Sequence, residues 1–278
     1  MRIRLDIAYD GTHFRGWARQ PGLRTVQGTL EEALVRILGS PVQLVVAGRT
    51  DAGVHARDQV AHLDLAPEQE ERLRPHRRSQ AGQDPVHALA ARVRGVLGAY
   101  SDVTVSRTSV APEGFDARFS AVWRRYEYRI SDVASGVDPL RRHLVLRWPR
   151  RLDDAAMHTA AEGLVGLHDF AAFCRRREGA TTTRDLQRLD VVRTRDEVAV
   201  TVQADAFCHS MVRSLVGALI AVGEGRRTPD WPVTLLRHGR RADEVVVAPA
   251  HGLTLVHVEY PPADRLAERA EQTRARRD

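Results

Sequence analysis

The first part of the chain shows two apolar patterns that predict regular structure. Residues 2–9 place isoleucine, leucine, isoleucine and tyrosine at alternate positions, with arginine, aspartate and alanine between them. Alternation with a period of two is typical of an antiparallel strand with one buried face. Farther along, Thr25 precedes apolar residues at helical spacing and Gly39 follows them. A capping threonine and a terminal glycine predict a helix over residues 26–38.

Most of the remaining pattern predicts short strands separated by few helices. The predicted strands cover residues 42–47, 59–65, 103–105, 120–131, 143–147, 186–193, 197–207 and 253–260. The predicted helices cover residues 86–97, 153–164 and 208–222. Because the strands alternate instead of being apolar throughout, the sequence predicts an α+β fold with a largely antiparallel sheet. The charged residues 66–84 are predicted to be an exposed connection.

The chain length accommodates two domains with cores of their own. It has 278 residues, of which 43% are hydrophobic and 28% are charged, and a domain takes roughly 100–200 residues. We expect an N-terminal subdomain over residues 1–108, a C-terminal subdomain over residues 109–260 and a charged, mobile tail over residues 261–278.

Several classes of protein and site are disfavoured by the same sequence. No segment approaches the ~18 uninterrupted apolar residues of a membrane span, and the N-terminus lacks a signal-peptide core. The two cysteines, Cys174 and Cys208, are too few for a disulfide framework or a cysteine-rich zinc site, and their scarcity favours a reducing compartment. We therefore expect a cytoplasmic protein that does not bind membranes.

The charge balance favours a polyanionic partner. The net charge is +6, and all 42 basic residues are arginine. Codon usage in a GC-rich genome explains the absence of lysine, but it does not explain the surplus of positive charge, which suits phosphate contacts with nucleic acid. The glycine-rich fingerprints of nucleotide-binding folds are absent from the sequence.

The segment Gly48–Ala56 is the most informative candidate for chemistry. Glycines on both sides of Arg49, Thr50 and Asp51 predict a tight loop at the end of a strand, with a carboxylate at its centre. Taken alone, the Asp51 motif is more typical of an aspartate that only accepts hydrogen bonds from its own turn.

Short segments spread over nearly the whole chain carry a resemblance to a known family. The earlier ones are Tyr9-Asp10-Gly11-Thr12, Phe14, Gly16-Trp17, Thr25-Val26-Gln27-Gly28-Thr29-Leu30-Glu31 and Gly48-Arg49-Thr50-Asp51-Ala52-Gly53-Val54-His55-Ala56. The later ones are Phe115-Asp116-Ala117-Arg118-Phe119-Ser120-Ala121, Arg125-Tyr126-x-Tyr128, Gly166-x-His168-Asp169-Phe170, Met211-Val212-Arg213, Val216-Gly217 and Gly252-Leu253-x-Leu255-x-x-Val258-x-Tyr260. In order and spacing they resemble the tRNA pseudouridine synthase A family.

The resemblance implies a fold, a reaction and partners. The fold would be two ferredoxin-like, RRM-like subdomains that form an extended, mostly antiparallel sheet around a basic catalytic cleft. The reaction would be isomerisation of uridine to pseudouridine in the anticodon stem-loop of tRNA. Because one glycosidic bond breaks and another forms without redox chemistry, we expect no cofactor and no metal. The partners implied are the anticodon arm of tRNA and a second copy of the chain in a homodimer.

The resemblance also assigns catalytic roles. It makes Asp51 the nucleophile, which adds to C6 of the base, attacks C1′ of the ribose or acts through a ribose-derived intermediate. It makes Arg213 the cation that keeps Asp51 ionised and oriented. Tyr126 corresponds to a tyrosine that stacks on the target base and assists removal of the proton from C5. The chain departs from the family pattern at Ala18 and Cys208, where glutamine and leucine are usual, and neither departure touches these three matches.

RNA contacts are expected from arginines close to these residues. Arg49 is predicted to contact a phosphate or help extrude the base, and Arg124 and Arg125 are predicted to bind RNA. Further candidates for backbone contacts are Arg141-Arg142, Arg150-Arg151, Arg175-Arg176-Arg177 and Arg226-Arg227. Two other readings remain open: a non-catalytic RNA-binding protein with this fold, and a pseudouridine synthase that acts on another RNA.

Overall fold

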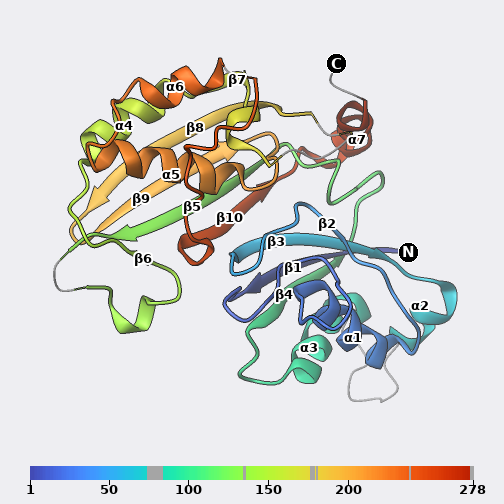
Figure 1. The fold of residues 1–278 in the computed structure, drawn as a ribbon. Helices are drawn as coiled ribbons and strands as arrows, with labels where there is room; N and C mark the ends of the chain where they lie inside the picture. The colour runs from blue at the N-terminus through green and yellow to red at the C-terminus, as the bar shows by residue number, and fades with distance from the viewer. Residues whose placement is uncertain (74–83, 134–135, 176–178, 180, 238, 276–278) are drawn as a thin grey trace. The chain divides into compact units, whose positions relative to one another are not determined.

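The computed structural model describes residues 1–73, 84–133, 136–175, 179, 181–237 and 239–275. The chain forms two units, which are drawn together in Figure 1 and described here one at a time. Unit 1 comprises Met1–Val122 and His257–Arg276, and unit 2 contains Trp123–Val256. Both units combine helices with mostly antiparallel strands, which confirms the predicted α+β class.

Unit 1 has the strand order of a ferredoxin-like fold. Its strands are β1 (Arg2–Tyr9), β2 (Val45–Val46), β3 (His55–Asp64) and β4 (Val103–Val110). Its helices include α1 (Val26–Leu38), α2 (Pro67–Leu73) and α3 (Pro85–Leu97). The strands lie in the order β4-β1-β3-β2, and every neighbouring pair is antiparallel. With α1 and α3 as the crossovers on one face of the sheet (Figure 1), this is the split βαβ arrangement.

The local signals read from the sequence explain β1 and α1. Ile3, Leu5 and Ile7 alternate with polar residues and are fully buried. Thr25 caps α1 by accepting a hydrogen bond from the backbone N–H of Gly28 at 3.2 Å. Gly39 ends the helix with φ at 78°, a left-handed conformation that glycine adopts without steric cost.

Unit 2 repeats the strand order of unit 1 and adds two strands. Its strands are β5 (Trp123–Ser131), β6 (Leu146–Arg147), β7 (Gly166–Asp169), β8 (Thr183–Thr194), β9 (Glu197–Ala204) and the Leu253–Val256 part of β10 (Leu253–Glu259). The order β10-β5-β9-β8 corresponds to β4-β1-β3-β2 of unit 1, with β7 added beside β8 and β6 paired in parallel with β5. The two units are thus related in topology, as the resemblance implied.

Helices α4 (Asp154–Glu162), α5 (Met211–Gly223) and α6 (Trp231–Leu236) cover one face of the unit 2 sheet (Figure 1). Nearly every residue of α5 is buried, because α4, α6 and the sheet surround it. Short 3-10 helices occur at Pro139–Arg141 (η2), Ala171–Phe173 (η3), Ala250–Gly252 (η4) and Ala263–Arg265 (η5). Within the described residues, no helix is long and apolar enough to span a membrane.

The structure differs from the predicted organisation at both ends of unit 1. The expected boundary after residue 108 falls inside β4, whereas the contacts divide the chain after Val122. The segment expected to be a mobile tail contains helix α7 (Leu266–Arg274), which buries Leu266 and Ala270. These two apolar residues are one helical turn apart among charged ones, so the mean charge of the segment concealed the buried stripe.

The expected exposed connection at residues 66–84 differs in the same way. Helix α2 occupies its first part, and Gln69 and Leu73 of that helix are buried one turn apart. Gln69 also donates to the hydroxyl of Ser40 at 2.8 Å. Residues 74–83 lie outside the described part of the chain.

The two cysteines are joined in unit 2. Cys174, at the end of η3, forms a disulfide with Cys208, which lies just before α5, and their Cα atoms are 5.7 Å apart. The cysteine count argued against a framework of several disulfides, and one bridge is consistent with that prediction.

Candidate active site

The loop that carries Asp51 connects β2 to β3 in unit 1, and the backbone of the segment after β1 holds it in place. The N–H of Trp17 donates to the carbonyl of Thr50 at 3.0 Å, and the N–H of Gly53 donates to the carbonyl of Phe14 at 3.3 Å. Within the loop, the N–H of Val54 donates to the carbonyl of Asp51 at 3.2 Å. The two sequence motifs around Trp17 and Asp51 therefore form one structural feature.

Two glycines permit this close approach of the backbones. A Cβ atom at Gly11 would lie 2.1 Å from the carbonyl oxygen of Val54, so no side chain fits there. Gly16 has φ at +92°, and a Cβ atom there would lie 3.0 Å from the carbonyl oxygen of Thr50. The glycines of the first motif are explained by backbone packing against the Asp51 loop.

A buried hydrogen-bond network fixes the loop from the side of the core. The hydroxyl groups of Tyr9 and Thr50 are 2.7 Å apart, and the side-chain amide of Gln59 donates to the Tyr9 hydroxyl at 3.3 Å. The same amide donates to the carbonyl of Gly48 at 2.9 Å. Burial raises the pKa of Tyr9 to about 12, so its phenol stays protonated at neutral pH. We call Tyr9, Thr50, Gln59 and Gly48 the loop clamp.

Gln59 belongs to none of the sequence motifs described above. Gln59 is fully buried in β3, where the exposed Asp58 precedes it and the buried Val60 follows it. A glutamine on the buried side of a strand must find partners inside the protein, since an unpaired buried amide is costly. Because β3 also contains His55, Arg57, Asp58 and His62, the strand pattern did not single out Gln59, and its role follows from the folded structure.

The clamped backbone contrasts with the accessible side chains of the loop. Asp51 is half-buried and Arg49 is exposed, whereas Thr50 between them is buried. Within the described part of the chain, Arg49 has no hydrogen bond or ion pair. His55, which follows the loop, is buried and accepts a hydrogen bond from the N–H of Gly11 at 3.0 Å. The loop thus presents a carboxylate and a guanidinium on a rigid backbone.

Strand β5 of unit 2 carries three of the predicted site residues on its two faces. Arg124 and Tyr126 are largely buried, and Arg124 donates to the carbonyl of Asp205 at 2.7 Å. The ring of Tyr126 packs edge-to-face against Phe207, with centroids 5.2 Å apart. Arg125 lies on the other face, because successive side chains of a strand alternate.

Arg125 is held by the neighbouring strand and by an aromatic ring. Its guanidinium donates to the side-chain oxygen of Gln203 at 2.7 and 3.0 Å and lies 4.7 Å from the centroid of Trp123. Half-buried and oriented, Arg125 presents a guanidinium beside an indole, a combination suited to RNA.

Arg213 occupies the first turn of α5 and bonds to the segment before η4. Its Nε donates to the carbonyl of Ala248 at 2.7 Å, and the N–H of Ala248 donates to the carbonyl of Arg213 at 3.0 Å. A Cβ atom at Gly217 would lie 1.7 Å from the carbonyl oxygen of Val246, so this glycine permits the contact. Burial raises the pKa of the nearby Tyr128 phenol, and the charge of Arg213 opposes that shift. Arg213 is therefore a positioned side chain.

The structure brings Asp51 and Arg49 together on one loop of unit 1. It places Arg124, Arg125 and Tyr126 on β5 and Arg213 on α5, all in unit 2. The predicted pairing of Asp51 with Arg213 stays a prediction. No cluster of potential metal ligands occurs among the residues that the structure describes.

Known proteins are similar to this chain over almost its entire length. Residues 160–261 match the family described as tRNA pseudouridine synthase. The tRNA pseudouridine synthase A of Frankia casuarinae is 58% identical over 277 residues, which are 99% of this chain and 95% of that protein. The corresponding proteins of Leifsonia xyli subsp. xyli and Mycobacterium leprae are 57% and 50% identical, over 99% of this chain and 97% and 94% of theirs. This chain belongs to the tRNA pseudouridine synthase A family and is an RNA pseudouridine synthase.

Proposed function

We propose that this enzyme converts uridines of the tRNA anticodon stem-loop to pseudouridine, with Asp51 as the nucleophile and without a cofactor. The observation that carries the proposal is the clamped loop: its backbone is held by Trp17, Phe14 and Gln59, while the carboxylate of Asp51 remains half-exposed. A nucleophile needs such positioning, because a reacting atom displaced by about 1 Å loses much of the rate.

The proposed chemistry needs one carboxylate and a route for one proton. The N1–C1′ bond of the uridine breaks, the uracil turns, and C5 bonds to C1′. The proton on C5 is then removed and N1 gains a proton, so atoms and charge balance without an external reactant. Asp51 either forms a transient covalent bond, at C6 or at C1′, or acts through a ribose-derived intermediate, and it is regenerated at the end.

We assign supporting roles to two residues of unit 2. Arg213 keeps the carboxylate of Asp51 ionised and oriented, since a guanidinium lowers the pKa of a neighbouring carboxyl group. Tyr126 stacks on the uracil and assists removal of the C5 proton. Both side chains are held by their own unit, Tyr126 by Phe207 and Arg213 by Ala248.

RNA binding is proposed to depend on the surrounding arginines. Arg49 and Arg125 are exposed or half-buried, and they contact phosphates or help extrude the target base from the stem. Arg124 is largely buried, so we expect a smaller direct contribution from it. We further propose a cytoplasmic homodimer, which sedimentation of the purified protein tests directly.

The experiment that tests the function maps pseudouridine in tRNA. An unmodified tRNA transcript is incubated with the purified protein in the presence of a chelator, and pseudouridine is located by carbodiimide labelling and primer extension. We expect signal in the anticodon arm with the wild-type protein and none with Asp51→Ala. Signal elsewhere in the tRNA would overturn the target, and tight binding without any signal would favour a non-catalytic RNA-binding protein.

A further inference from the structure

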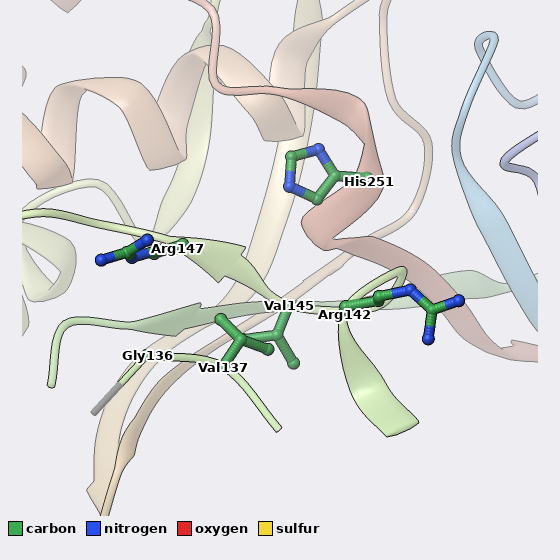
Figure 2. A pocket seen from close by; sticks show the side chains of 6 residues that line it. All are labelled: Gly136, Val137, Arg142, Val145, Arg147 and His251. Carbon is green, nitrogen blue, oxygen red and sulfur yellow. The ribbon is translucent and has the colours of Figure 1, made fainter. Parts of the chain in front are cut away.

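Unit 2 contains a pocket that none of the proposed catalytic residues lines. Its volume is about 400 Å³, within the range of small-ligand sites. The lining residues follow β5 or belong to η4: Gly136, Val137, Arg142, Val145, Arg147 and His251. Figure 2 shows the arginine side chains extending to opposite sides, with the His251 ring above the two valines.

Neither of the two pocket arginines has a carboxylate partner among the described residues. Arg142 donates to the carbonyl of Pro139 at 2.7 Å, and within the described residues the side chain of Arg147 has no hydrogen bond or ion pair. By contrast, the adjacent Arg141 pairs with Glu197 at 2.5 Å. None of the described residues that line the pocket is acidic. The pocket therefore presents two uncompensated positive charges.

The backbone around both arginines is held by regular contacts. Arg147 lies on β6 opposite Ser131 of β5, and the N–H of Trp148 donates to the carbonyl of Ser131 at 2.7 Å. Arg142 follows η2, which Arg141 ties to β9 through Glu197. The backbone that carries the two arginines is thus ordered before a ligand arrives, which removes part of the entropic cost of binding.

The arrangement indicates a ligand with two anionic ends and a planar or apolar middle. A single phosphate ion would be bound by cations that converge on one point, whereas Arg142 and Arg147 point away from each other (Figure 2). Between them lie an imidazole ring and two valine side chains. Unpaired bases of RNA stack on aromatic side chains, histidine included, and arginines contact the phosphates on either side.

We propose that this pocket binds one unpaired nucleotide of the tRNA substrate. Arg142 and Arg147 contact its two flanking phosphates, and His251 stacks on its base. The inference rests on tRNA as the substrate, and it adds a contact that holds the RNA without taking part in the reaction.

The test measures tRNA affinity of the full-length protein as a function of salt. Arg142→Ala and Arg147→Ala should each weaken binding of an unmodified tRNA transcript about 5-fold. In a plot of the logarithm of the association constant against the logarithm of the salt concentration, each should make the negative slope shallower by about 0.7–0.9. The Arg142→Ala, Arg147→Ala double variant should make this slope shallower by about twice that amount. His251→Ala should weaken binding about 5-fold with the wild-type slope, because stacking does not release counterions.

Two controls keep the outcome interpretable. Arg188→Ala removes the same charge from an exposed residue of unit 2 that pairs with Asp190, and it should leave affinity and slope near the wild-type values. The Arg142→Lys, Arg147→Lys protein should recover most of the slope, since it keeps both charges. Thermal unfolding of each variant verifies that the exposed substitutions leave the fold intact.

The result that would overturn the proposal is wild-type affinity and slope in the double alanine variant. Equally contradictory would be binding of free AMP that the double variant loses while tRNA affinity stays unchanged, because the pocket would then serve a free nucleotide. If the wild-type protein binds tRNA but forms no pseudouridine, the proposed function fails. The binding assay then still tests whether the pocket contacts tRNA.

Discussion

The two units share a strand order but position their candidate functional residues differently. Unit 1 places Asp51 on an irregular loop, which is held by two glycines of close approach and by the loop clamp. Unit 2 places Tyr126 and Arg213 on a strand and a helix, where regular hydrogen bonding already sets the backbone. The same topology thus supports two ways of orienting a side chain, and the loop requires more supporting residues than the regular elements.

The largest expected effect comes from filling the close backbone approaches. Gly11→Ala in unit 1 and Gly217→Ala in unit 2 each place a methyl group within 2.1 Å of a carbonyl oxygen. We expect each to lower the free energy of unfolding by about 3 kcal/mol, the upper range for overpacked sites. Chemical denaturation measures the loss, and hydrogen exchange should locate it in the substituted unit.

A matched control separates this effect from the general response of glycine to substitution. Gly95 lies within α3, and a Cβ atom there would meet nothing within 4 Å. Gly95→Ala should stabilise the protein by about 1 kcal/mol, because alanine has the higher helix propensity. Equal destabilisation by all three substitutions would contradict the close-approach argument.

The next effect concerns the loop clamp, which has no counterpart among the regular elements. Gln59→Leu leaves the carbonyl of Gly48 without its side-chain donor, and we expect a stability loss of about 2 kcal/mol. Because the loop also carries Asp51, the rate of pseudouridine formation should fall about 10-fold while tRNA affinity is retained. Gln187→Leu, at an exposed position of β8, should change neither quantity by a comparable amount. An unaltered rate in Gln59→Leu would show that the clamp does not position Asp51.

The smallest expected effect is a response of unit 1 to acid. Burial, with a contribution from Arg2, lowers the pKa of His62, whose Nδ1 accepts a hydrogen bond from the N–H of Ala117 at 3.0 Å. The unfolded chain therefore binds the proton first as pH falls. Stability from neutral His62 is fully present above its ordinary pKa of about 6.5 and is lost below it, by less than about 1.4 kcal/mol per pH unit.

Hydrogen exchange at pH 7 and pH 5.5 measures this loss in peptides of both units. We expect reduced protection in the unit 1 strands of the wild-type protein and a smaller reduction in His62→Gln, which has no group to protonate at this position. Loss of protection confined to unit 2 would contradict the assignment of the acid response to His62.

The sequence patterns predicted elements whose signals are local. Alternation identified β1, and the cap at Thr25 with the glycine at 39 placed both ends of α1. Helices α2 and α7 were missed because each buries only two residues within a charged segment. Local composition does not report such sparse burial, which depends on the partner surface supplied by the rest of the unit.

The candidate site also combines features that the sequence indicated with features that only the folded chain shows. The resemblance selected Asp51, Tyr126 and Arg213, but it gave no reason for their supporting contacts. The bond between Gln59 and Gly48 joins residues 11 positions apart, and the disulfide joins cysteines separated by 34 positions. Contacts of this kind depend on the folded chain and carry no periodic signal. Strand alternation places Arg124 on the same face as Tyr126, but its burial depends on the folded unit and was not predicted.

The central claim is that Asp51 performs the chemistry and does not merely shape the loop. The most direct measurement is the single-turnover rate of pseudouridine formation by Asp51→Asn, together with its tRNA affinity. Asparagine preserves the size of the side chain and its capacity to accept hydrogen bonds while removing the nucleophilic charge. We predict a rate loss of at least about 10³-fold with affinity within about 3-fold of the wild type. A rate within about 10-fold of the wild type would contradict the claim.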